Sequence, residues 1–130
     1  MIKSVLIKSG VLGIIAVLGG AFGAHALKEV LTSEQLMSFN RGVRYQLIHA
    51  VVLLFIFLLM TKYENKQFKI AAQLIFLGVI LFSGSIYILT LKNLIGLELL
   101  KYVGPITPIG GLLIITGWLF IILGGIKLKE

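Results

Sequence analysis

Four long runs of apolar residues divide this sequence, and they leave few folds open to it. Each run has about 19 to 24 residues, and about 20 are needed for a helix to cross a hydrocarbon core of about 30 Å. The runs cover approximately residues 4–26, 42–60, 68–91 and 105–126. They lack the period-two alternation of membrane-spanning strands, whereas helices satisfy their own backbone hydrogen bonds in lipid. The sequence predicts an all-α membrane protein, a bundle of four transmembrane helices in one domain over residues 1–130.

Composition agrees with this reading and excludes several kinds of chemistry. Apolar residues make up 58% of the chain and the mean hydropathy is +1.07, more than a small soluble domain can bury. The net charge is +7, but Lys and Arg lie between the apolar runs and at the ends, as in proteins at an anionic membrane surface. We therefore expect no nucleic-acid partner. The absence of cysteine excludes disulfides and thiolate sites.

The distribution of Lys and Arg predicts the orientation of the helices. Seven of these residues lie at the termini and between the second and third runs, and five lie in the other two connections. Because Lys and Arg accumulate on the cytoplasmic side, we expect both termini in the cytoplasm. One alternative remains for the N-terminus, because Lys3, Lys8 and the segment Ala24-His25-Ala26 resemble a cleaved signal peptide.

The connections carry local signals of their own. Thr32 or Ser33 is a suitable helix cap, and the residues that follow suit a short amphipathic helix on the membrane surface. The connection of residues 92–104 is expected to lie along the interface. Pro108 either falls in the first turn of the fourth helix or interrupts it.

Glycine is concentrated in the first and fourth runs. Between membrane helices, small residues permit close backbone contact, so we expect these two helices to pack tightly within the bundle, with a homo-oligomer as the alternative. The glycines assigned to helix packing are Gly19, Gly20, Gly23, Gly110, Gly111 and Gly117.

Polar residues at membrane depth form one candidate site. The predicted topology places them in the outer halves of all four helices, and polar groups in hydrocarbon usually turn inward to find partners. The residues are His25, Arg41, Tyr45, His49, Ser83, Ser85, Tyr87 and Thr107. Two interpretations stay open: a hydrogen-bonded plug that fixes helix register, or an outward pocket that binds a lipid headgroup, a small solute or a partner protein.

Catalysis and metal binding have little support in the sequence. Zinc requires three or four protein ligands, and His25, His49 and Glu29 supply at most three. There is no carboxylate pair within a span, no Ser/His/Asp set and no phosphate-binding loop before a helix. We expect a non-enzymatic protein without a cofactor or metal. A small-solute carrier or channel is the main alternative, although all five acidic residues lie outside the spans.

Four segments resemble a known family in the same order along the chain. They are Gly20–Lys28 (GAFGAHALK), Tyr45–Ala50 (YQLIHA), Leu81–Tyr87 (LFSGSIY) and Ile106–Gly111 (ITPIGG). The chain is similar to the uncharacterised YwdK/YgdD family of small bacterial membrane proteins, related to transmembrane protein 256 of animals. The resemblance implies four membrane helices and a bacterial cytoplasmic membrane, but no active site. We expect a scaffold or accessory protein, with membrane lipids and a membrane protein or a second copy as its partners.

Overall fold

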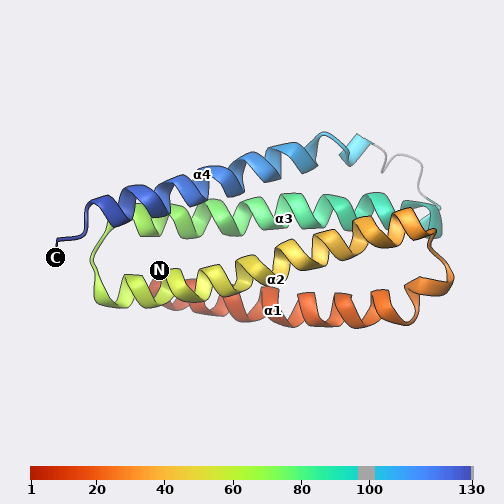
Figure 1. Ribbon diagram of the computed structural model, residues 1–130, viewed down its shortest axis with the longest axis horizontal. Coiled ribbons are helices and arrows are strands. Elements are labelled where there is room, and N and C mark those ends of the chain that lie inside the picture. Colours follow the sequence, from red (N-terminus) through yellow and green to blue (C-terminus); the bar gives the residue numbers. More distant parts are fainter. Residues whose placement is uncertain (97–101, 130) are drawn as a thin grey trace.

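A computed structural model describes residues 1–96 and 102–129 and contains four long α-helices (Figure 1). The elements in order are α1 (Ile2–Ala24), a short 3-10 helix η1 (Leu27–Glu29), α2 (Ser33–Lys62), α3 (Lys66–Ile95) and α4 (Ile106–Ile126). All four α-helices are long and apolar enough to cross a membrane. The all-α class and the four long apolar helices predicted from the sequence are therefore confirmed, and these helices are candidate membrane spans.

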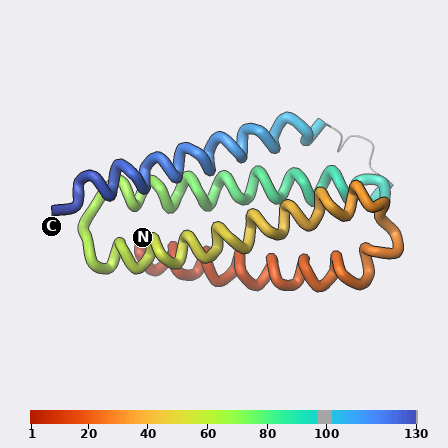
Figure 2. Tube along the Cα trace, viewed as in Figure 1, coloured from red at the N-terminus to blue at the C-terminus, as the bar shows by residue number. Residues whose placement is uncertain are grey.

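Helices that are neighbours in the chain are also neighbours in space. α2 packs against α1 and α3, and α4 packs against α3, so α1 and α4 lie at opposite edges (Figure 1). The tube view shows both chain ends toward the end where α2 passes into α3 (Figure 2). We call this the terminal end, and the opposite end, which carries η1 and the start of α4, the distal end.

α2 begins where the sequence predicted a helix start, but it extends further than expected. The Thr32 hydroxyl accepts from the Gln35 backbone N–H at 3.2 Å, and the Gln35 side chain accepts from the Thr32 N–H at 3.0 Å. This capping box opens a helix that continues unbroken to Lys62. The separate surface helix expected here is therefore wrong: Phe39 is buried, with its ring centroid 5.1 Å from that of Tyr87.

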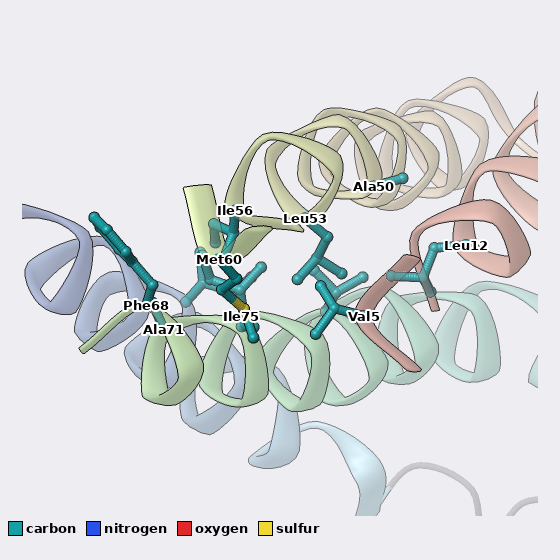
Figure 3. Packing of buried hydrophobic residues seen from close by; sticks show 12 residues of the cluster. Val5, Leu12, Ala50, Leu53, Ile56, Met60, Phe68, Ala71 and Ile75 are labelled. Atoms are coloured by element: carbon teal, nitrogen blue, oxygen red, sulfur yellow. The ribbon is translucent and has the colours of Figure 1, made fainter. Parts of the chain in front are cut away.

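The terminal half of the molecule is filled by apolar side chains. In Figure 3, Leu53, Ile56 and Met60 of α2 point toward Ile75 of α3, with Val5 of α1 beside them. All five are nearly inaccessible. Burial of this kind in lipid stabilises through close packing, because lipid tails are as apolar as the side chains themselves. The terminal half is therefore a dry, packed core.

Glycines bring α3 and α4 close together. A methyl group at Gly78 would lie 2.8 Å from the backbone nitrogen of Ile114, and one at Gly117 would lie 2.5 Å from Cγ1 of Ile75. Only hydrogen fits at these two positions. On α1, a methyl group at Gly19 would lie 3.3 Å from Val43. The other glycines assigned to packing also lie opposite atoms of a neighbouring helix, and they are Gly20, Gly23, Gly110 and Gly111.

The start of α4 settles the position of Pro108. Pro105 caps the helix and Pro108 lies within its first turn, where a missing N–H has no helical acceptor to lose. The alternative of a break at this proline is wrong. Of the connection expected over residues 92–104, the first part is helical, because α3 continues to Ile95. Residues 97–101 lie outside the described residues.

Candidate functional site

A chain of side-chain hydrogen bonds joins the first three helices. The Tyr87 hydroxyl of α3 donates to Oε1 of Gln46 at 2.7 Å, and Nε2 of Gln46 donates to the Leu12 carbonyl of α1 at 2.9 Å. Gln46 is only 3% exposed. Its amide therefore has both a donor and an acceptor partner where lipid offers neither.

Two buried serines attach α1 and α3 to the backbone of α2. The Ser9 hydroxyl donates to the Ala50 carbonyl at 2.8 Å, and the Ser83 hydroxyl donates to the Gly42 carbonyl at 2.7 Å. Each carbonyl oxygen has a second lone pair beyond the one used in the helix. These bonds fix the register of the three helices.

His49 connects α2 to α4. The indole Nε1 of Trp118 donates to Nε2 of His49 at 3.2 Å, and Nδ1 of His49 lies 2.7 Å from the Tyr45 carbonyl. Because an indole N–H only donates, Nε2 is the acceptor and Nδ1 carries the ring hydrogen. His49 is 4% exposed, and the Tyr45 ring lies between it and Phe82, at centroid distances of 6.0 and 4.8 Å.

A groove lies on the distal side of this contact, between α2 and α4 and above α3. Its cavity volume is about 450 Å³. α2 provides a polar wall, α3 provides an apolar floor that ends in Thr90, and α4 contributes Thr107. The lining residues are Glu34, Gln35, Ser38 and Arg41 on the wall, Phe82, Ile86, Leu89 and Thr90 on the floor, and Thr107. We call this cavity the distal groove.

The polar groups of the distal groove differ in whether they already have partners. Thr107 bonds to Ser85, with 2.6 Å between the hydroxyl oxygens, and Thr90 donates to the Ile86 carbonyl at 2.9 Å. In the part of the chain that the structure describes, the side chains of Glu34, Ser38 and Arg41 form no hydrogen bond or ion pair. The α2 wall thus presents three side chains that are free to bind a ligand: the Ser38 hydroxyl, the cationic Arg41 and the anionic Glu34.

The structure divides the predicted polar cluster into adjoining groups. Arg41 and Thr107 line the distal groove, and Ser85 supports Thr107. Tyr45 packs against Phe82 of the groove floor and His49 is bonded to α4, but neither is among the lining residues of the groove.

The remaining predicted residues lie elsewhere. Ser83 and Tyr87 bond to α2 on the side that faces α1. His25 is exposed at the C-terminus of α1, and its ring forms no hydrogen bond within the described residues. A binding role for the cluster stays a prediction.

Sequence reasoning missed three kinds of residue here. Gln46 was not singled out, although Phe39, Gln46, Leu53 and Met60 recur at seven-residue intervals and are all buried. That spacing marks the inward stripe of a packed helix, so it could have identified Gln46. The groove residues Glu34, Gln35 and Ser38 were missed because their segment was assigned to a separate surface helix. Trp118 carries no such signal, because α4 is apolar all round.

No metal site is evident in the described part of the chain. Within residues 1–96 and 102–129, no three His, Cys, Asp or Glu residues lie close enough together to hold a metal ion. Both ring nitrogens of His49 are already engaged. Zinc bound only by protein needs more ligands than His25 and Glu29 provide.

Fold and composition together define a small α-helical membrane protein with four candidate spans. Residues 19–111 match the family described as "Protein of unknown function (DUF423)", and the chain belongs to this family. A UPF0382 membrane protein of Staphylococcus haemolyticus is 40% identical over 108 residues, or 83% of each chain. The membrane protein YwdK of Bacillus subtilis is 33% identical over 126 residues, covering 96% of this chain and 98% of the relative.

A further relative also carries the UPF0382 name and is described as an inner membrane protein. The inner membrane protein YgdD of Escherichia coli is 34% identical over 128 residues, covering 98% of this chain and 93% of the relative. No solved structure matches the chain. The resemblance to the YwdK/YgdD family is therefore confirmed, and the protein is a bacterial membrane protein.

Proposed function

We propose that this protein is a non-enzymatic scaffold or accessory protein that holds one phospholipid in the distal groove. The observation that carries the proposal is the uncommitted polar wall of α2 facing an apolar floor on α3. An amphipathic molecule can satisfy both surfaces at once. A water-soluble solute would leave Phe82, Ile86 and Leu89 without an apolar partner.

Helix length supports a position of the groove at the level of lipid headgroups. α2 and α3 have 30 residues each, so each is about 45 Å long, whereas the hydrocarbon core is only about 30 Å thick. The apolar part of α2 begins near Gly42 and reaches almost to its end at Lys62. The surplus length is therefore at the distal end, where Glu34 to Arg41 lie among headgroups and Phe82 lies beside acyl chains.

The charge distribution supports cytoplasmic termini. Lys62, Lys66 and Lys69 surround the α2–α3 connection at the terminal end, beside the Lys residues of both termini. The positive-inside rule supports a cytoplasmic terminal end, so the distal groove opens toward the outer leaflet.

A carrier or channel is the rival function, and the terminal half of the molecule argues against it. A transport path from the distal groove would have to pass the side chains of Leu53, Ile56 and Ile75, which are fully packed. Gln73, a polar residue in the terminal half of α3, is exposed, and its Nε2 lies 3.9 Å from the Met1 sulfur. The packing supports a closed terminal half.

The groove chemistry also supports binding rather than catalysis. Glu34 is the only carboxylate among its described lining residues, and within the described part of the chain the Ser38 hydroxyl forms no hydrogen bond to a base. General acid–base work by carboxylates needs a second group, and a serine nucleophile needs a base within hydrogen-bond reach. A partner protein or a second copy remains the alternative occupant.

Native mass spectrometry of the purified protein tests the proposal with a matched pair of arginine variants. Arg41 lines both the distal groove and a neighbouring recess, whereas Arg44, one turn later, lines the recess but not the groove. In nanodiscs that contain phosphatidylethanolamine and phosphatidylglycerol, we expect Arg41→Gln to reduce the lipid-bound fraction about threefold, the size of an exposed ion pair.

Arg44→Gln removes the same charge at the same membrane level, and we expect it to leave the bound fraction unchanged. Equal lipid binding by both variants and the wild-type protein would show that the groove is not the lipid site. Release of the wild-type protein from the nanodiscs without any bound lipid would refute the proposed function outright.

A further inference from the structure

We infer that the lipid in the distal groove carries a primary ammonium group beside its phosphate, as phosphatidylethanolamine does, with the phosphate at Arg41 and the ammonium at Glu34. This inference rests on the proposed function, because it names the class of lipid that the same groove selects. Selection of this headgroup differs from simple attraction of an anionic lipid, which would require only the positive charge of Arg41.

The spacing of the two charges fits such a headgroup. Glu34 and Arg41 are seven residues apart, so they lie on the same face of α2, about 10 Å apart along its axis. Both side chains are long and flexible and can reach toward the space between them. Ser38 lies one turn from each charged residue and contributes a hydroxyl donor for the phosphate.

The charge balance of the wall also favours a zwitterion. Neither Glu34 nor Arg41 has an ion-pair partner among the described residues. A headgroup with only a negative charge would compensate Arg41 but would leave Glu34 repelling it. A headgroup with a phosphate and an ammonium compensates both, and its three N–H donors match a carboxylate acceptor.

Gln35 reinforces this polarity. Its Oε1 already accepts from the Thr32 backbone N–H, whereas both N–H donors of its amide group are free for a ligand. Those donors lie next to Glu34 and on the wall of the groove. They suit the phosphodiester oxygens rather than the ammonium group, and Glu34 is the only anionic acceptor among the described residues of the wall.

Glu34 has a second, purely structural effect that the test must separate. It lies in the first turn of α2, where a negative charge favours the helix N-terminus. That effect changes stability but does not distinguish one lipid headgroup from another. The readout is therefore the ratio of bound lipids and not their total amount or the melting temperature.

The experiment measures bound phosphatidylethanolamine against bound phosphatidylglycerol by native mass spectrometry, in nanodiscs with equal amounts of the two. For the wild-type protein we expect about a threefold preference for phosphatidylethanolamine, the effect of one exposed charge pair. Glu34→Gln removes attraction for the ammonium and repulsion of the anionic lipid, so the ratio should fall to about one or below. Glu29→Gln is the control, since Glu29 is exposed at the distal end but does not line the groove.

Two results overturn the inference. One is an equal preference in the wild-type protein and in Glu34→Gln, and the other is the same change in ratio from Glu29→Gln. Either would leave the proposed function intact as long as Arg41→Gln still lowers total lipid binding. Loss of the Arg41 effect would instead refute the proposed function itself.

Discussion

Replacement of Gln46 by Leu should destabilise the protein by about 1–2 kcal/mol. The substitution removes two hydrogen bonds between helices, to Tyr87 and to the Leu12 carbonyl. Such bonds contribute about 0.6 kcal/mol each on average in membranes. The rest of the effect comes from the Tyr87 hydroxyl, which loses its acceptor where lipid supplies no substitute. Leu fills nearly the same volume as Gln, so no large cavity contributes.

The assay is equilibrium unfolding in mixed micelles, with Gln73→Leu as the matched control. Gln73 lies on α3 with an exposed side chain and lacks strong hydrogen bonds, so we expect its substitution to change stability by less than about 0.5 kcal/mol. Tyr87→Phe should cost less in the Gln46→Leu background than in the wild-type protein, because the two residues share one bond.

Equal stability of the Gln46 and Gln73 variants would refute the reasoning. The same holds for additive effects of Gln46→Leu and Tyr87→Phe. Either result would mean that the buried amide does not hold the first three helices together.

Three further predictions concern other contacts, each measured by the same unfolding assay. His49→Ala should cost on the order of 1 kcal/mol, because Trp118 loses its acceptor, and no loss would show that this contact is dispensable. Gly78→Ala should cost about 1–3 kcal/mol by forcing α4 away, whereas Gly84→Ala, where a methyl group meets nothing within 4 Å, should cost little. Asn65→Ala should cost about 1 kcal/mol, since this side chain caps α3 and donates to a carbonyl of α4 at 3.0 Å.

The helices were predictable because lipid leaves the backbone so few choices. Apolar run length alone indicated four long helices, and Thr32 indicated a helix start, although that of a separate surface helix rather than that of α2. The ends of α2 and α3 were underestimated, because hydropathy reports where hydrocarbon begins and not where a helix ends. The segment from Ser33 to Arg41 is richer in polar residues yet helical, held by the capping box and by the buried ring of Phe39.

The site was less predictable, for a geometric reason. Arg41, Tyr45 and His49 are four residues apart, and each step of four turns the helix by about 40°, so the three side chains fan out. Only His49 is buried. The distal groove depends on the angles at which α2 and α4 cross α3, and no local sequence pattern encodes those crossing angles.

Photo-crosslinking with a phospholipid that carries a diazirine near the top of its acyl chain tests the central claim most directly. Crosslinks mapped by peptide mass spectrometry should concentrate on Phe82, Ile86 and Leu89 and should decrease in Arg41→Gln. Exposed residues on the outer faces of α1 and α4, such as Ile14 and Ile115, should react only at background level. Crosslinks spread evenly over those faces, with no excess on the groove floor, would contradict the account.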